Sequence, residues 1–228
     1  MTSIRPRLVV FDCDGTLVDS QHGIVACMAA AYVAEGLPAP DAEAVRRVIG
    51  LPLPECMQRL SPDHPASRHE RLTAAYKEAF FALRQRPDHH EPLFEGARDV
   101  LERLTDEGVL LGIATGKARR GLLAVLERHG LASSFVTLQT ADIGPGKPHR
   151  AMLDRAMGET GASSVDTVMI GDTSFDMAMA RNAGVHAIGV TWGYHPAEEL
   201  RAAGAHVLVD RFAELPERLG FERSATCA

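Results

Sequence analysis

The chain has 228 residues, of which 46% are hydrophobic and 24% charged, and its 24 Lys and Arg against 30 Asp and Glu give a formal net charge of −6. This length suits one large domain, or a core with a smaller module, and can bury a substantial core. The acidic balance argues against a general nucleic-acid-binding protein, which needs a basic surface for the phosphate backbone. Aromatic residues make up only 5% of the chain, which leaves few platforms for stacking bases.

Membrane and secretory segments are not expected either. The longest apolar run, residues 24–34, is shorter than the roughly 18 residues that a membrane helix needs. The first residues lead directly into an apolar strand, without room for the apolar region of a signal peptide. The cysteines form neither a CxxC pair nor a zinc-binding spacing; they are Cys13, Cys27, Cys56 and Cys227. We therefore expect reduced thiols in a cytoplasmic protein.

Short β-branched and aliphatic runs alternate with segments of helical periodicity. The predicted strands are Leu8–Phe11, Leu110–Ala114, Phe135–Leu138, Thr167–Ile170, Ala187–Val190 and His206–Val209. Between them, apolar residues recur with helical spacing, for example over 97–104. Gly108, Gly130 and Gly184 follow such stretches, where a left-handed helix cap favours glycine. This alternation predicts an α/β fold: a doubly wound, Rossmann-like parallel sheet with helices on both faces.

Only helices are predicted between the first strand and residue 91. An alanine-rich helix runs to about Glu35, Asp41 is placed to cap a second helix, and a further helix spans about Ala66–Arg86. A helical insertion of this length predicts an all-helical cap domain, residues 20–91, inserted into an α/β core of residues 1–19 and 92–228. The segment 88–91, Asp-His-His-Glu, would then be a solvated linker rather than a metal site.

Polar side chains suited to chemistry follow several of the predicted elements. They are Asp12 and Asp14 after the first strand, Thr115 after the second, Lys147 in a turn that opens a helix, and Asp172 and Asp176 after the fourth; Gly15 and Gly116 form the turns that follow the first two strands. Each group alone has an ordinary structural explanation, such as a cap or a surface charge. The carboxyl ends of parallel strands, however, form the ligand crevice of an α/β sheet. Converging carboxylates repel one another, so together they predict a divalent cation beside an anion, with one carboxylate as a nucleophile for phosphoryl transfer.

In this order, the segments resemble the four motifs of the haloacid dehalogenase-like hydrolases, and specifically their phosphatase branch with a helical cap inserted after the first motif. Gly171-Asp-Thr173, Asp176 and Asn182-Ala-Gly184 are similar to the corresponding stretch of phosphoglycolate phosphatases. The resemblance implies Mg²⁺-dependent hydrolysis of a small, phosphoglycolate-like phosphate monoester through an aspartyl-phosphate intermediate. The implied partner is a small phosphorylated metabolite, with no nucleic acid and no membrane.

The resemblance also implies a role for each residue. Asp12 would attack phosphorus, and Asp14 would protonate the leaving oxygen and then activate the water. The residues implied to bind the phosphoryl group are Gly15, Thr115, Gly116 and Lys147. Mg²⁺ would be held by the Asp12 side chain, the Asp14 backbone carbonyl and Asp172. Asp176 would support the metal through water or orient Lys147.

The substrate is less well indicated than the chemistry. Gly116 stands where related phosphatases often have Asn or Ser, and a sugar-phosphate mutase or a pyrophosphatase would use the same catalytic residues. A 2-haloacid dehalogenase is disfavoured because that branch lacks the second aspartate. A regulator that has lost turnover is disfavoured because every catalytic position is filled. The oligomeric state is not predicted.

A few further residues are candidates for contact with the substrate. Lysine occurs only at Lys77, Lys117 and Lys147; Lys117 would either touch a substrate carboxylate or lie on a helix surface. The segment 50–52, Gly-Leu-Pro, resembles the loop that reaches toward the substrate in capped relatives. Arg46 and Arg47 nearby are candidates for binding an anionic leaving group, because arginine suits carboxylate and phosphate.

Overall fold

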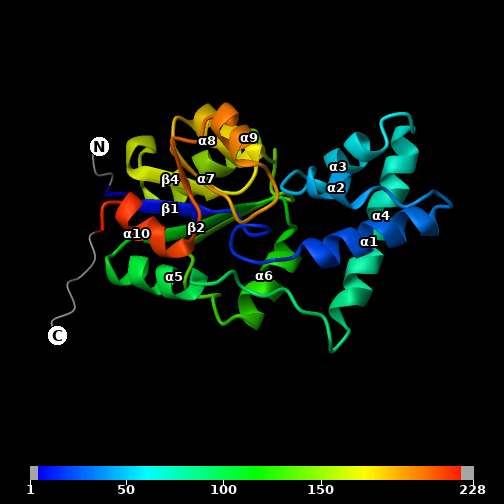
Figure 1. Ribbon diagram of the computed structural model, residues 1–228, viewed down its shortest axis with the longest axis horizontal. Coiled ribbons are helices and arrows are strands. Elements are labelled where there is room, and N and C mark those ends of the chain that lie inside the picture. Colours follow the sequence, from blue (N-terminus) through cyan, green and yellow to red (C-terminus); the bar gives the residue numbers. More distant parts are fainter. Residues whose placement is uncertain (1–4, 222–228) are drawn as a thin grey trace.

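The computed structural model describes residues 5–221 and contains one six-stranded sheet (Figure 1). The strands are β1 (Leu8–Phe11), β2 (Leu110–Thr115), β3 (Thr137–Thr140), β4 (Thr167–Gly171), β5 (His186–Val190) and β6 (Val207–Val209). They are all parallel, in the order β3-β2-β1-β4-β5-β6. The order of connection reverses beside β1, which is where α/β sheets of this kind bind ligands.

The predicted α/β class is confirmed, and β1 has the predicted bounds. The third strand is the exception, because it begins two residues later than the apolar run indicated. Its second half consists of the buried polar residues Gln139 and Thr140. Their side chains donate to Thr137 Oγ1 and Asp142 Oδ1, and such pairing lets polar residues occupy a strand that periodicity alone overlooks. The predicted left-handed glycines also hold, with φ of 78°, 65° and 68° at Gly108, Gly130 and Gly184.

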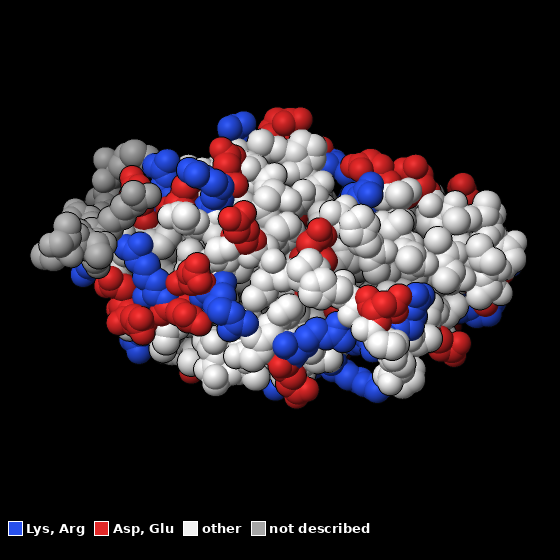
Figure 2. Space-filling model, turned by 60° about the horizontal axis from the view of Figure 1, so that its bottom comes forward, with Lys and Arg blue, Asp and Glu red and all other residues white. Residues whose placement is uncertain are grey.

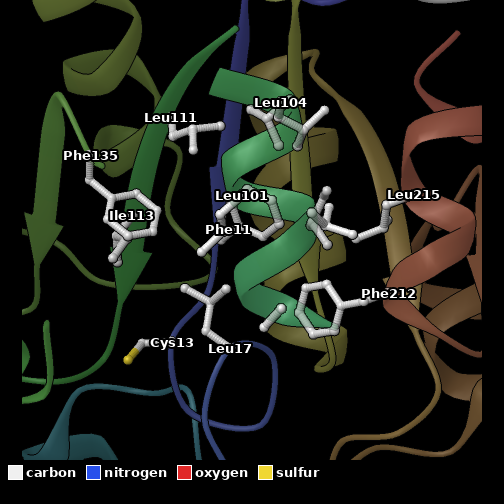
Figure 3. Close-up of a cluster of buried hydrophobic side chains, with 14 of the residues drawn as sticks. Phe11, Cys13, Leu17, Leu101, Leu104, Leu111, Ile113, Phe135, Phe212 and Leu215 are labelled. Atoms are coloured by element: carbon white, nitrogen blue, oxygen red, sulfur yellow. The ribbon is translucent and has the colours of Figure 1, made fainter. Parts of the chain in front are cut away.

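Helices cover both faces of the sheet (Figure 1). One face carries α5 (Ala97–Asp106), α6 (Arg119–Arg128) and α10 (Leu215–Arg218), and the other carries α7 (Ala151–Thr160), α8 (Ser174–Ala183) and α9 (Ala197–Ala203). Short 3₁₀ turns lie at η1 (Ser164–Asp166) and η2 (Phe212–Glu214). Alternate residues of β1 enter opposite cores, Val9 and Phe11 on one side and Leu8 and Val10 on the other. Figure 3 shows Phe11 packed among Leu101 of α5 and its neighbours.

Four helices between β1 and α5 form a separate group, called the cap helices below. They are α1 (Gln21–Ala34), α2 (Ala42–Arg46), α3 (Leu53–Leu60) and α4 (Ala66–Arg84). They lie beyond one end of the sheet (Figure 1) and share a buried cluster that includes Met28, Met57 and Leu72. The Asp41 side chain accepts from the backbone N–H groups of residues 43 and 44, so its predicted capping role is confirmed. The division of the chain at residues 20 and 91 stays a prediction.

The prediction of a solvated linker at residues 88–91 is only half right. Asp88 is exposed and pairs with Arg86, but Glu91 is 3% exposed. Its carboxylate lies 3.6 Å from Lys117 Nζ and 3.3 Å from His89 Nε2. A buried carboxylate needs such partners. The lysine comes from a distant part of the chain, which is why the local sequence resembled a polar loop.

The surface drawn in Figure 2 interleaves acidic and basic side chains without a continuous basic area. Within residues 5–221, none of the helices combines the length and apolar character required to cross a membrane. Cys13, Cys27 and Cys56 are buried free thiols, whereas Cys227 lies outside the described residues.

Candidate active site

The predicted catalytic segments meet at the carboxyl edge of the sheet, beside the reversal in strand order. Asp12 follows β1, Thr115 ends β2, and Asp172 follows β4. The register pairs Phe11 with both Ile113 and Ile170, so these strands end nearly level. The structure therefore brings side chains from three neighbouring strands to one place, as their spacing indicated.

Lys147 is fully buried and lies between two carboxylates. Its Nζ is 2.7 Å from Asp12 Oδ1 and 2.6 Å from Asp176 Oδ1. Burial alone would lower the pKa of this amine, but attraction to Asp12 and Asp176 outweighs it and raises the pKa above its ordinary value. The ammonium is therefore charged at neutral pH and fixes one oxygen of each carboxylate.

Asp176 is held in place by the start of α8. Its Oδ2 accepts from the Thr173 hydroxyl at 2.7 Å and from the Thr173 N–H at 3.0 Å, while Thr173 Oγ1 accepts from the Asp176 N–H. This reciprocal capping box satisfies donors at the helix start. One carboxylate oxygen thus anchors the helix and the other contacts Lys147, which agrees with the predicted alternative that Asp176 orients the lysine.

Three buried carboxylates could hold a divalent cation. Asp12, Asp172 and Asp176 each offer an oxygen within 4.8 Å of the others. Burial raises the pKa of Asp12 well above its ordinary value, and burial together with the charge of Asp176 raises the pKa of Asp172 to about 7. Asp12 Oδ2 is buried and has no hydrogen-bond partner among the described residues. Three clustered carboxylates supply the oxygen ligands that suit a hard cation such as Mg²⁺.

The turn after β1 packs tightly against Asp172. Asp172 Oδ1 accepts from the Thr16 hydroxyl at 2.8 Å, and Oδ2 accepts from the Tyr194 N–H at 2.9 Å. Gly15 has φ of 88°, and a Cβ added there would collide with the Asp172 carboxylate. Only glycine suits this position, because the backbone is left-handed and the space is filled.

Asp14 belongs to a different polar network from Asp12. Its Oδ1 accepts from Ser20 Oγ at 2.6 Å and lies 2.9 Å from Lys117 Nζ. The Ser20 N–H in turn donates to the Tyr194 hydroxyl at 3.3 Å. The Asp14 side chain is therefore held from two sides, and it is not part of the carboxylate cluster formed by its neighbour Asp12.

The structure does not place Lys117 on a helix surface, and its predicted contact with a substrate carboxylate stays a prediction. Its side chain is 8% exposed, contacts Asp14 and Glu91, and lies with Nζ 5.3 Å from the centre of the Phe80 ring. Ser20 and Glu91 were not identified as site residues from the sequence. The scarcity of lysine was the only signal toward this network, because its other members come from both ends of the cap segment.

The loop before α3 lies directly on the core segments. A Cβ on Gly116 would be 2.7 Å from the carbonyl oxygens of both Gly50 and Leu51, and one on Gly146 would collide with Pro52. The loop therefore reaches the site as the sequence predicted. It also explains why Gly116 departs from the Asn or Ser of related phosphatases, since a side chain has no room there.

A cavity of about 550 Å³ is lined by Asp12 and Asp14 on one side and by residues of the cap helices on the other. Of the predicted site residues, Asp12, Asp14, Thr115 and Gly116 line it; those that do not are Gly15, Lys147, Asp172 and Asp176. Arg46 and Arg47 do not line it either, so their predicted contact with a leaving group is not supported. Both guanidinium groups form ion pairs within the protein, Arg46 with Glu43 and Arg47 with Glu199.

Comparison with known proteins agrees with this architecture. Residues 9–190 match the sequence family described as haloacid dehalogenase-like hydrolase. The chain is 39% identical to "Probable phosphatase IndB" of Dickeya dadantii, over 91% of each chain. It is 31% identical to a phosphoglycolate phosphatase of Vibrio parahaemolyticus, over 95% of this chain and 97% of that one. The crystal structure of a hydrolase from Pseudomonas syringae matches with a TM-score of 0.83 at 28% identity, covering 93% of this chain and 97% of that chain. The resemblance seen in the motifs is thereby confirmed, and the chain belongs to the haloacid dehalogenase-like hydrolases.

Proposed function

We propose that this chain is a Mg²⁺-dependent phosphatase that hydrolyses a small phosphate monoester through an aspartyl-phosphate intermediate. The observation that carries the proposal is the arrangement of the two carboxylate oxygens of Asp12. One of its oxygens is 2.7 Å from Lys147 Nζ, while the other has no partner among the described residues, and the residue lines the cavity. The similarity to proteins named phosphatase and phosphoglycolate phosphatase supports the same reaction class.

In the first step, the free oxygen of Asp12 attacks phosphorus. A bond from Oδ2 to phosphorus forms as the bond from phosphorus to the leaving oxygen breaks. Lys147 holds Oδ1, so Oδ2 is presented for attack, and Thr115, which lines the cavity, binds a phosphoryl oxygen. Held by Asp12, Asp172 and the Asp14 carbonyl, with Asp176 in support, Mg²⁺ would supply the positive charge that offsets the carboxylates and the phosphoryl oxygens.

Asp14 performs the proton transfers. In its protonated form it gives a proton to the leaving oxygen, and in its ionised form it then takes a proton from the water that attacks phosphorus. The second step releases phosphate and restores the Asp12 carboxylate. Ser20 and Lys117 hold the Asp14 side chain at 2.6 and 2.9 Å, which keeps its carboxylate oriented through both steps.

The cap helices complete the proposed enzyme. We take residues 20–91 as a cap domain on a core of residues 1–19 and 92–228, since the cap helices have their own buried cluster. The Gly50–Pro52 loop then encloses the substrate, and water is excluded from the phosphoryl group. The buried free thiols Cys13, Cys27 and Cys56 suit a cytoplasmic protein acting on a phosphorylated metabolite.

The experiment that tests this function is turnover by the purified protein with Mg²⁺. The assay measures phosphate release from p-nitrophenyl phosphate and from a panel that contains phosphoglycolate, pyrophosphate and hexose phosphates. Turnover that disappears in Asp12→Asn is expected. A mutase would instead convert a hexose 1-phosphate to its isomer without phosphate release, and a pyrophosphatase would turn over pyrophosphate alone. Absence of Asp12-dependent turnover on every compound would contradict the proposal.

A further inference from the structure

The cavity above Asp12 is large and mostly apolar for a two-carbon leaving group. Pockets of about 300–1,000 Å³ are the size that holds drug-sized ligands, and this one measures about 550 Å³. The apolar lining includes Ile24, Met28, Val48, Ile49, Tyr76 and Phe80. Glycolate has almost no apolar surface to cover such side chains, whereas an apolar body placed against them is removed from water.

Among the described cations that line the cavity without an ion pair, Lys77 and Arg120 are exposed, and Arg84 is half-buried. Arg84, the last residue of α4, has a buried Nε without a hydrogen-bond partner, and no ion pair involving it is found among residues 5–221. Its guanidinium carbon lies 4.6 Å from the centre of the Phe80 ring. Lys117 differs, since Asp14 and Glu91 already engage it. A half-buried guanidinium whose Nε has no partner is suited to a carboxylate, which can accept two of its hydrogen bonds.

The position of Arg84 places that carboxylate at one side of the cavity. A Cβ on Gly121, in the first turn of α6, would lie 2.7 Å from Arg84 Nη2 and 3.0 Å from Lys117 Cγ. Arg84 therefore bridges the end of cap helix α4 and the start of core helix α6, next to the lysine that contacts Asp14. A group bound there belongs to the leaving group, because the phosphoryl group lies at Asp12 and Thr115.

We infer that the substrate is a phosphorylated hydroxy carboxylate whose leaving group has an apolar, ring-sized body and whose carboxylate is bound by Arg84. This inference rests on the proposed phosphatase function and adds the class of leaving group to it. It accounts for the apolar walls and for the unpaired guanidinium together. A sugar phosphate would leave the apolar side chains facing hydroxyl groups, and phosphoglycolate would leave most of the cavity unfilled.

A series of phosphate esters with similar leaving-group acidity tests the apolar part. Ethyl, butyl and 2-phenylethyl phosphate are all esters of primary alcohols, so their kcat/KM values compare binding of the alkyl body in the transition state. We expect kcat/KM to rise about fourfold for each methylene added between ethyl and butyl, and to be highest for the 2-phenylethyl ester. A flat or falling series, or a higher kcat/KM for phosphoglycolate than for the 2-phenylethyl ester, would overturn the inference.

The carboxylate is tested by adding it at the para position of 2-phenylethyl phosphate. The carboxylated ester should exceed the plain ester in kcat/KM by about tenfold, and Arg84→Gln should remove that ratio. Arg71→Gln is the matched control, since Arg71 is on the same helix, is 51% exposed, pairs with Glu35 and does not line the cavity. A ratio near one in the wild type, or a ratio that persists in Arg84→Gln, would overturn the role of Arg84.

The same assays separate failure of this inference from failure of the proposed function. Asp12-dependent turnover of p-nitrophenyl phosphate combined with a flat ester series would overturn the inference alone. Absence of Asp12-dependent turnover for every ester would overturn the proposed function and the inference together.

Discussion

The core holds a group of buried charged residues that are paired with one another, whereas the cap helices line the cavity with apolar side chains and with the half-buried, unpaired guanidinium of Arg84. Asp12, Lys147 and Asp176 form a buried chain of ion pairs at the strand ends, while Phe80 and Arg84 represent the opposite wall. Ion pairs that are complete before substrate arrives hold the reacting groups in fixed positions. The apolar side chains and Arg84 of the cap take no part in bond making or breaking, but they determine which leaving group fits the cavity. The comparison separates catalysis in the core from selection in the cap, and each prediction below tests that separation.

The largest effect is expected from Asp12→Asn. The amide cannot act as the nucleophile, so kcat should fall by at least about 1,000-fold for every ester. Thermal unfolding should show a folded protein, because Asn matches Asp in size. A fall in kcat of less than about tenfold would show that the core is not organised as proposed.

Lys147→Arg should lower kcat by about 100-fold or more, as expected for loss of a positioned charge. The planar guanidinium is larger than an ammonium and cannot take the fully buried position 2.7 Å from Asp12 and 2.6 Å from Asp176. Arg150→Lys is the control, since that arginine is 53% exposed, pairs with Asp154 and does not line the cavity. Full activity in Lys147→Arg would contradict the assignment of this lysine to the catalytic core.

The carboxylate cluster should make metal binding depend on pH. The folded-state pKa of Asp172 is raised to about 7, above the value of roughly 4 for an exposed aspartate. Its contribution to stability in metal-free protein is therefore present below about pH 4 and is lost as pH rises through 7. We expect the rise in Tm caused by saturating Mg²⁺, compared with EDTA, to be a few degrees larger at pH 8 than at pH 5. Asp172→Asn should abolish this difference, and an equal rise at both values in the wild type would count against the metal site.

Glu91→Gln tests whether the contacts of Glu91 with Lys117, and of Lys117 with Asp14, position Asp14 for proton transfer. Removing this charge frees Lys117 from one of its two carboxylates, and kcat should change about threefold to tenfold with little change in KM. The pH profile of kcat should shift as well, a result that a purely structural role would not produce. Asp88→Asn, in the exposed part of the same linker, is the control. A change confined to KM or to Tm would place Glu91 outside the catalytic network.

An effect as small as that of Glu91→Gln is expected in the cap. Phe81 lines the cavity and is 49% exposed, so Phe81→Ser should lower the ratio of kcat/KM for 2-phenylethyl and ethyl phosphate by about threefold to tenfold. The value for ethyl phosphate should hardly change. Val33→Ser is the matched control, because Val33 is also exposed on a cap helix but does not line the cavity. An equal loss of kcat/KM for both esters in Phe81→Ser would contradict the division between catalysis in the core and selection in the cap.

The same division explains what could be predicted from the sequence. Asp12 follows β1 directly and Asp172 follows β4, so local patterns were enough to locate the core of the site. The cap side depends on packing between distant residues. Arg84 of α4 lies against Gly121 of α6, and Glu91 lies close to Lys117. Neither contact can be predicted from the local sequence pattern.

The prediction for Arg46 and Arg47 was not supported for the same reason. Their proximity in sequence to the Gly50–Pro52 loop suggested a contact with substrate, but surface carboxylates of Glu43 and Glu199 engage them. Charge type alone does not say which arginine is free to bind a ligand. Arg84, by contrast, is half-buried beside the Phe80 ring and keeps a buried Nε without a partner among the described residues.

The central claim is that Asp12 carries the phosphoryl group during turnover, and trapping that intermediate tests it most directly. Protein mixed with Mg²⁺ and p-nitrophenyl phosphate is quenched in acid within the first turnover, digested and analysed by mass spectrometry. The account predicts a phosphoryl group on the peptide that contains Asp12, removed by hydroxylamine and missing in Asp12→Asn. Turnover without any phosphorylated peptide, or a phosphoryl group on another residue, would contradict it.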